Sequence, residues 1–524
     1  TDRVERVNNY GRIIGGSSGE GLAITGAGGP DEINNYGEID GNISIPNITK
    51  NIYNAPTGRI EAQFVNLNGN VDLTNSGTVS PNGEYRIGRL EINANYITTT
   101  TSNYEADLVL RSGVTDQLIV QYAADLAGTV TLLANQVGQA KPGTFLSEGI
   151  ITTADGIDLD KLRLSAPTSA VATFALQKVD SGRNLAFNYT VNYAPSGLNP
   201  NGAAVGQAVN QIQAAGSTAG FEPTAALIFA QQNISQLNTL YQQLSGATNT
   251  VFPQVTIDAA QGFQEDVLAM LKTTPINQSQ RCLQQLQLLK PGEDFKGYPE
   301  DCGKWQGWFM AGGYNATTPG QGSSNQSGYN TAAFNSMAGA DALVGPNTLV
   351  GAAARYDNLS TTTTPGQSAY GNTQGWSGLL YAKQRLGKST WLTGLLGSGG
   401  FGTNITRQVS VQNPSTEQGT SQSTALGGAL TLSQVIKTAE AGSLTPRIGI
   451  SWMQLNQGSY NESTSSSNTA YQQPGNPLVS YPNPGKASYS LNYASAAYTS
   501  TPLEIGFDFK HPLKAGKMLF TPRL

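Results

Sequence analysis

The sequence predicts an all-β protein with a helical linker, in the order N-terminal parallel β-helix, α-helical linker and C-terminal antiparallel β-barrel. Three observations predict this order: an Asn/Gly repeat near the start, helical spacing in the middle, and strictly alternating apolar residues towards the end. We expect the β-helix over residues 1–190, the linker over 191–303 and the barrel over 304–524. Several domains also suit a chain of 524 residues, which is too long for one ordinary core.

The repeat starts with Asn-Asn-Tyr-Gly, which occurs at 8–11 and again at 34–37, and worn copies follow near 54–58 and 75–77. Self-similarity at a period of about 20–27 residues is typical of a solenoid, although coincidental Asn/Gly-rich loops are an alternative. Asn and Gly tolerate the left-handed backbone of a tight corner. An apolar residue precedes each corner, and we expect the four to stack in one internal column: Val7, Ile33, Ile52 and Leu73.

The middle of the chain changes to helical spacing. We expect a helix near 205–212, a longer helix over 222–245, a third near 263–271 and a last one over 277–290. The second has a proline in its first turn and a glycine after its last residue, both typical helix boundaries.

From Trp305 onward, strands of roughly ten residues alternate strictly; Leu503 and Ile505, for example, alternate with Glu504 and Gly506. In an outer-membrane barrel one face of each strand meets lipid and the other faces a water-filled lumen. The charged residues on one face of these strands fit that arrangement. A soluble up-and-down barrel is the alternative. The charged side chains that we expect in the lumen are Arg355, Lys383, Arg385, Glu504, Asp508 and Lys510. The tryptophans that we expect at the membrane interfaces are Trp305, Trp308, Trp376, Trp391 and Trp452.

Composition excludes several function classes. The net charge is −5 and the basic residues are scattered, so we expect no nucleic-acid partner. The sequence contains no apolar run of 18 residues, so we expect no membrane helix. It also contains no signal peptide, and it begins at Thr1 as a processed or incompletely traced chain would. Cys282 and Cys302 are the two cysteines; they predict one local disulfide in an exported chain, with two free thiols as the alternative, and make no convincing zinc site. We expect no metal and no cofactor.

Catalysis has little support in the sequence. A Ser-His-Asp triad needs a histidine within reach of the serine, and the only histidine, His511, ends a barrel strand. Glu38 and Asp40 lie two apart on one strand face, as a glycan-cleaving carboxylate pair would. Exposed acidic residues are usually only solvated, so we expect no catalytic residues and no enzyme.

Solenoid, helical linker and barrel in this order resemble the classical monomeric autotransporters of type Va secretion. Three segments carry the resemblance: Trp305–Tyr314 is similar to the family's first barrel strand, Leu240–Gly246 to its helical stretch before the barrel, and about 105–190 to its autochaperone region. The resemblance implies an outer-membrane protein with its passenger on the cell surface, in contact with lipid and, during biogenesis, with the barrel-assembly machinery. The family has about twelve strands and a terminal aromatic residue. Eight or nine strand-like segments precede Leu524, so we expect the last strands to be missing.

The function predicted is an outer-membrane autotransporter that displays a short, non-catalytic β-helix for adhesion or surface assembly, with an unknown surface ligand or neighbouring surface proteins as its partner. A carbohydrate-active β-helix and a porin-like barrel with a periplasmic extension are the alternatives. We also expect a helix inside the barrel lumen. The first choice is 277–290, which directly precedes the first strand, although 224–245 is long enough to span the membrane.

Overall fold

The computed structural model divides into two compact units, which meet in sequence between Ser245 and Gly246. The residues that it describes are 6–16, 21–26, 32–48, 50–69, 71–216, 220–287, 299–320, 327–364, 369–409, 415–437, 442–467, 489–510, 513–515 and 518–520. The predicted linker 191–303 is therefore not a unit of its own, because its first helices pack in the first unit and its last two in the second.

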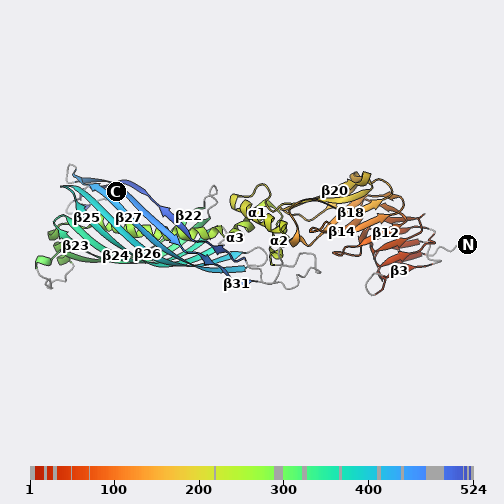
Figure 1. Ribbon diagram of the computed structural model, residues 1–524, viewed down its shortest axis with the longest axis horizontal. Coiled ribbons are helices and arrows are strands. Elements are labelled where there is room, and N and C mark those ends of the chain that lie inside the picture. Colours follow the sequence, from red (N-terminus) through yellow and green to blue (C-terminus); the bar gives the residue numbers. More distant parts are fainter. Residues whose placement is uncertain are drawn as a thin grey trace. The chain divides into compact units, whose positions relative to one another are not determined.

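The first unit is a parallel β-helix with three strands per rung, coloured red to yellow in Figure 1. One sheet contains β1 (Arg6–Asn9), β4 (Glu32–Asn35), β7 (Ile52–Asn54), β10 (Asp72–Asn75), β13 (Asn95–Thr98) and β16 (Ala124–Asp125). The second contains β2 (Arg12–Ile14), β5 (Glu38–Asp40), β8 (Arg59–Ala62), β11 (Thr78–Pro81), β14 (Asn103–Val109), β17 (Gly128–Asn135) and β19 (Leu162–Ser165). The third contains β3 (Leu22–Thr25), β6 (Asn42–Ser44), β9 (Phe64–Asn66), β12 (Arg89–Asn93), β15 (Gln117–Val120) and β18 (Gly143–Thr153).

The predicted internal column is present and its register is confirmed. Val7 pairs with Ile33, Ile33 with Ile52, and Ile52 with Leu73. The last three are at most 1 % exposed, and Val7 packs against the core from the first rung. Stacking matters because a single rung cannot hide its apolar face from water.

A second internal column explains why the repeat contains asparagine. Asn9 donates to Asn35 (Nδ2–Oδ1 2.8 Å), Asn35 to Asn54 (2.8 Å), and Asn54 to Asn75 (2.7 Å). Asn75 in turn donates to the hydroxyl of Tyr96 at 3.2 Å, which ends the column. The remaining amide hydrogens bond backbone carbonyls at the corners, for example Asn54 to Gly58 and Thr78. Each amide therefore satisfies buried groups of two adjoining rungs at once.

Asn54→Leu should destabilise the β-helix by roughly 2–4 kcal/mol. Leucine keeps the volume but removes one hydrogen-bond partner each from the amide of Asn35, the oxygen of Asn75 and two corner carbonyls, and each lost hydrogen bond costs about 0.5–1.5 kcal/mol. Urea unfolding followed by circular dichroism measures the change. Asn8→Leu, at an exposed position of the first rung, is the matched control, and an equal loss in both variants would contradict a role for the column.

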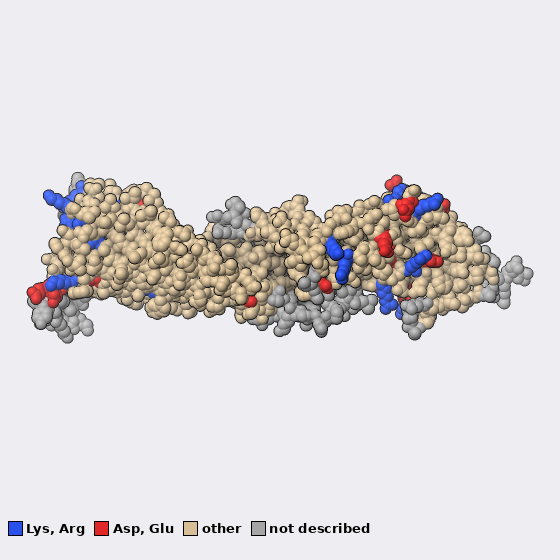
Figure 2. Space-filling model, in the orientation of Figure 1, with Lys and Arg blue, Asp and Glu red and all other residues tan. Residues whose placement is uncertain are grey.

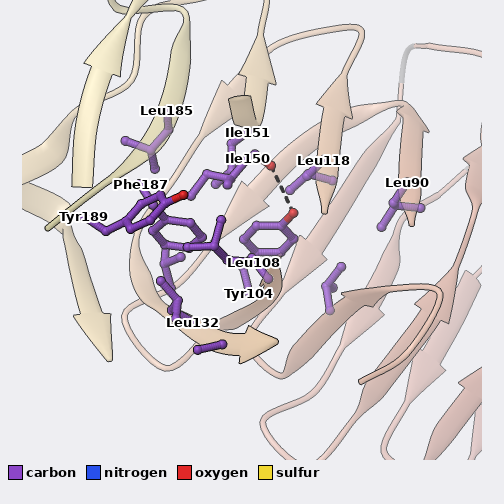
Figure 3. Packing of buried hydrophobic residues seen from close by; sticks show 14 of the residues in the cluster. Leu90, Tyr104, Leu108, Leu118, Leu132, Ile150, Ile151, Leu185, Phe187 and Tyr189 are labelled. Atoms are coloured by element: carbon purple, nitrogen blue, oxygen red, sulfur yellow. Dashed lines mark hydrogen bonds between the residues drawn. The ribbon is translucent and has the colours of Figure 1, made fainter. Parts of the chain in front are cut away.

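The last rungs of the β-helix are closed by antiparallel strands. β21 (Asn184–Val191) pairs antiparallel with β18 and with β20 (Ala172–Val179). Phe187 and Tyr189 bring aromatic rings over the end of the core, and Tyr104 donates its hydroxyl to the carbonyl of Ile150 at 3.0 Å (Figure 3). Antiparallel pairing supplies partners for strand edges that a parallel stack would leave open.

Helices follow the last rung. α1 (Pro200–Ala214), α2 (Glu222–Phe229) and α3 (Ile234–Ser245) belong to the first unit, α4 (Val251–Thr273) and α5 (Gln278–Gln287) to the second. The prediction of one helix over 222–245 is wrong: Asn233 caps a new helix by accepting the amide hydrogen of Gln236 at 3.0 Å. Among the described helices, none combines the length and apolar character needed to cross a membrane.

The second unit is a curved antiparallel sheet whose strands run from green to blue in Figure 1. Its long strands are β22 (Trp305–Thr318), β23 (Gly328–Gly345), β24 (Thr348–Thr364), β25 (Ala369–Arg385), β26 (Thr390–Val409), β27 (Ser415–Gln434) and β29 (Ser443–Gln457). Shorter strands on or beside it are β28 (Ile436–Lys437), β30 (Tyr460–Asn461), β31 (Ser463–Ser467), β32 (Asn492–Tyr493), β33 (Ala496–Ser500), β34 (Leu503–Lys510), β35 (Leu513–Ala515) and β36 (Met518–Phe520). The expected length of roughly ten residues was too short, because β22 to β27 run for 14–20 residues and continue into polar Thr, Asn and Ser segments.

The two faces of this sheet differ as the alternation predicts. β25 alternates buried and exposed residues along most of its length. The outward side chains are large and apolar, and include Phe309, Phe334, Leu380, Leu396, Leu430, Ile450 and Ile505. On the face drawn in Figure 2, charged residues of this unit gather towards one end and the wall beside them carries almost none. An apolar outer wall and a polar inner face are the surfaces that a membrane-embedded sheet requires.

Candidate functional site

The concave interior of the antiparallel sheet holds α4, the green helix enclosed by strands in Figure 1. α4 contacts β23 to β27 and β29. Small residues of the wall make room for it: a Cβ on Gly371 would lie 2.2 Å from the ring of Phe252. Phe263, Val267 and Leu271 pack against buried wall residues along the second half of the helix. The helix is thus fitted into the sheet over its whole length.

The preference for 277–290 as this helix was wrong. α5 lies beyond the end of α4, and its buried side chain, Arg281, pairs with Asp341 at 2.5 Å. The reason lies in apolar content: in α4 twelve of 23 residues are buried, whereas the Gln-rich α5 buries only Arg281. The segment 224–245 belongs to the first unit instead.

A buried polar network fixes the chain just before α4. Asn249 donates to the carboxylate of Glu462 at 3.0 Å and to the hydroxyl of Tyr493 at 2.8 Å. Glu462 also forms an ion pair with Arg407 (2.5 Å), and both side chains are 0 % exposed. The rings of Tyr460 and Tyr493 stack beside it with centroids 4.5 Å apart. Our sequence analysis missed this network. Arg407 has the same parity as the lumen-facing residues of β26, which is the signal that could have found it.

Arg355 holds the middle of α4 from the wall. It is 2 % exposed and pairs with Asp357 on its own strand at 2.8 Å and with Asp266 of α4 at 2.9 Å. Its guanidinium carbon also lies 5.9 Å from the centre of the Phe263 ring. Arg355 therefore lies in the lumen position predicted for it, and bonds both the wall and the helix.

Lys383 holds the C-terminal end of α4. Its ammonium donates to the carbonyls of Leu271 and of Thr274, the latter at 3.1 Å, and lies 5.3 Å from the ring centre of Trp391. A cation suits this position because the last carbonyls of a helix carry partial negative charge. Beside it lies a cavity of about 280 Å³, lined by α4 residues, Lys383, Trp391, Arg447, Glu504 and Asp508 among others.

Lys383→Met should loosen the last turn of α4 by about 1–2 kcal/mol, because it removes two charged hydrogen bonds to helix carbonyls. Hydrogen exchange of the full chain in detergent micelles measures this as faster exchange near Leu271. Lys388→Met, at an exposed turn position, is the matched control. Unchanged exchange at the end of α4 in the Lys383 variant would show that packing alone holds the helix.

The other predicted lumen residues lie around the same cavity or beside it. Glu504 and Asp508 line the cavity and both pair with Arg447, at 2.6 and 2.8 Å. Arg385 lies over Trp391 at 5.4 Å and donates to turn carbonyls, including that of Gly387. The side chain of Lys510 and all of His511 lie outside the described residues.

Two tryptophans differ from their expected interfacial positions. Trp305 and Trp376 are 67 % and 66 % exposed on the outer wall, and Trp452 pairs with Gly428 on the same outward parity. Trp308 and Trp391 point inward, because Trp308 donates to the hydroxyl of Tyr381 at 3.0 Å and Trp391 lies beneath Lys383. Trp308 is three residues from Trp305, so the period of two already places them on opposite faces.

The acidic residues considered for glycan chemistry lie on the outer face of the β-helix. Carboxylate oxygens of Glu38, Asp40 and Glu61 come within 4.8 Å of one another. Arg12 pairs with Glu38 at 3.2 Å and with Asp40 at 2.7 Å. Arg59 pairs with Glu61, so each carboxylate already has a cationic partner.

A second acidic pair, missed by sequence analysis, is buried in the β-helix. Asp107 and Asp116 are each 1 % exposed. Asp107 accepts a hydrogen bond from the backbone amide of Arg86, and Asp116 accepts one from the backbone amide of Gly88. Asp116 also accepts the amide hydrogen of Asp107 at 2.9 Å. Burial raises the pKa of Asp107 to about 7 and that of Asp116 to about 8, and for Asp116 the neighbouring Asp107 adds to the effect.

Comparison with known protein families settles what the antiparallel unit is. Residues 307–476 match the model of the autotransporter beta-domain family. The C-terminal region is an autotransporter β-domain. This match supports an outer-membrane location for the chain, with the N-terminal β-helix as a surface-exposed passenger. No curated protein matches the chain.

Solved structures give weaker similarities. The translocator domain of the autotransporter NalP from Neisseria meningitidis is 17 % identical, with a TM-score of 0.30; the match covers 46 % of this chain and 75 % of that one. The RagAB peptide transporter is 9 % identical, with a TM-score of 0.24, over 39 % of this chain and 28 % of that one.

Proposed function

We propose that the passenger is a short, non-catalytic rod that the β-domain displays for adhesion or surface assembly. The observation that carries the proposal is the pairing of charges along the outer face of the β-helix. Arg12 and Arg59 neutralise the carboxylates that a glycan-cleaving or cation-binding site would need. Arg59 also reaches Glu105 at 2.7 Å, so the ladder continues along the rod.

Paired charges favour recognition over catalysis. A catalytic carboxylate must be free to exchange a proton or to attack the substrate, whereas each of these carboxylates is engaged in an ion pair with a guanidinium. The same ladder offers a partner a rigid row of donors and acceptors. Two exposed tyrosines, Tyr10 and Tyr36, stack at 4.9 Å on the early rungs and add an aromatic surface.

The experiment compares cells that carry the full chain, a chain without the β-helix, and the double variant Glu38→Gln/Asp40→Asn. We expect the full chain to promote attachment of the cells to a surface or cell–cell aggregation, and the deletion to abolish it. The double variant should retain the activity, because a non-catalytic rod needs no reactive carboxylate and the amide oxygens of glutamine and asparagine can still accept hydrogen bonds from Arg12. Protease added to intact cells should remove the passenger and leave the β-domain.

The carbohydrate-active alternative rests on the close approach of Glu38, Asp40 and Glu61. It predicts release of oligosaccharides from acidic polysaccharide by cells with the full chain, and loss of that release in the double variant. This pair of results would replace the adhesion proposal. Release that persists in the double variant would point to catalytic residues elsewhere and would also contradict a non-catalytic rod.

A further inference from the structure

The segment between α4 and the first strand of the β-domain forms a small cluster of its own. Cys282 of α5 is bonded to Cys302, 20 residues later. Gln278 donates to the carbonyls of Glu300 (2.8 Å) and Cys302 (3.1 Å), and Arg281 donates to that of Gly303 at 2.8 Å. α5 is thus attached along its length to residues 300–303.

This cluster is also attached to the wall. Arg281 pairs with Asp341 of β23 at 2.5 Å, and the side chains are 0 % and 1 % exposed. Asp341 accepts the hydroxyl of Tyr381 at 3.2 Å, and that hydroxyl accepts the indole hydrogen of Trp308. A chain of hydrogen bonds therefore joins α5 to β22, β23 and β25.

We propose that α5 and residues 299–305 form a disulfide-closed clasp that fixes the C-terminal end of α4 inside the β-domain, and that reducing the disulfide releases this end. Only the residues 274–277 separate α4 from α5. A link of four residues reaches at most about 14 Å, so a fixed α5 keeps the end of α4 close to Lys383.

The disulfide sets the register on which the other contacts of the clasp depend. α5 is ten residues long and rich in glutamine, and helices of this length are marginal in water without tertiary contacts. Closing a loop of this size by a disulfide favours the ordered form on the order of 100-fold. The N-terminal half of α4 does not depend on the clasp, because Asn249 and Phe252 hold it from the other end.

Release needs a two-electron reductant. A dithiol such as dithiothreitol attacks the bridge, breaks the S–S bond, and leaves two protein thiols while the reductant closes into a cyclic disulfide. Two electrons and two protons pass from the dithiol to the protein. The chain has no other cysteine, so the reagent has a single target.

Hydrogen exchange of the full chain in lipid nanodiscs, with and without dithiothreitol, tests the clasp. We expect exchange to accelerate roughly 10- to 100-fold in 278–287 and in the last two turns of α4, with the first half of α4 and β23 unchanged. Intact mass rises by about two units on reduction if the bridge is present. Cys282→Ser/Cys302→Ser should show the fast exchange without reductant and no further response to it.

The ion pair gives an independent variant. Arg281→Met leaves the charge of Asp341 buried without its partner, which destabilises the fold, so Arg281→Met/Asp341→Leu removes both charges together. It should release α5 with the disulfide intact. The proposal is overturned if reduction frees α5 while the end of α4 keeps its protection, or if the whole β-domain loses protection at once. It is also overturned if the intact mass does not change.

Discussion

Raising the pH from near 5 to near 9 is expected to destabilise the passenger by several kcal/mol, whereas the variant Asp107→Asn should keep only the part of this pH dependence that Asp116 contributes. The cause is the buried pair Asp107 and Asp116, whose pKa values burial raises to about 7 and about 8. In the unfolded chain both ionise near pH 4. The folded state therefore binds more protons than the unfolded state between about pH 4 and pH 8.

Stability falls wherever the folded state holds more protons and the pH rises. The contribution of the pair is fully present below the unfolded pKa and is lost as the pH rises through the folded values. A difference of one in pKa corresponds to about 1.4 kcal/mol, so the ionisation of Asp107 alone should cost on the order of 4 kcal/mol. Glu105, Tyr85 and Tyr104 face the same pair, and the charge on Glu105 opposes the ionisation of Asp107.

Asparagine is a suitable replacement at position 107 because the neighbouring Asn135 can reorient its side-chain amide to hydrogen-bond it. Asn135 now donates to Asp107 at 3.1 Å, and its own side-chain oxygen has no hydrogen-bond partner among the residues that the structure describes. If Asn135 turns its amide over, this oxygen can accept from the new side chain. The variant should be more stable than the native chain near pH 9 and no more stable near pH 5, so that the two pH profiles cross.

Urea unfolding of the full chain, measured at several pH values by circular dichroism, tests this expectation. Asp155→Asn, an exposed position in the same unit, is the control and should keep the native pH profile. Parallel profiles for the native chain and Asp107→Asn would contradict the assignment of the pH dependence to the buried pair.

Much of the fold is predictable from the sequence because it repeats local rules. The Asn/Gly corners and the apolar residue before each corner specify the rung, and stacking then forces Val7, Ile33 and Ile52 into register. The alternation in the barrel strands likewise separates outer wall from lumen, as Leu503 and Glu504 illustrate. In both cases one period decides the position of many side chains.

The candidate site is less predictable because it depends on contacts between distant segments. The sequence around Asn249 contains no pattern that predicts its hydrogen bonds with Glu462 and Tyr493. Choosing between α4 and α5 as the enclosed helix requires knowing which helix the wall of the sheet can accommodate. The space that Gly371 leaves for the ring of Phe252 is one such feature, and the periodicity of the sequence does not predict it. Asp107 and Asp116 were missed for the same reason: their burial comes from the loop at 86–88.

Arg407→Met should be the most damaging single change in the β-domain, with a loss of about 3–5 kcal/mol. The side chains of Arg407 and Glu462 are both 0 % exposed, and removing one partner leaves the other charge buried without this counter-charge. Glu462 would keep the amide of Asn249 and the backbone amide of Leu491 as donors, which limits the loss but does not neutralise it.

A double-mutant cycle separates the value of the pair from the cost of the orphaned charge. Arg407→Met/Glu462→Gln should recover most of the stability, because glutamine is neutral and its oxygen can still accept from Asn249. Heat-dependent mobility on gels and urea unfolding in micelles measure the β-domain, and hydrogen exchange at Phe252 reports the start of α4. We expect Arg407→Met to loosen that start while the clasp end stays protected, because the two ends of α4 are held by separate contacts. If the double variant is as unstable as the single one, the geometry of the ion pair, and not its charge balance, holds the helix in place.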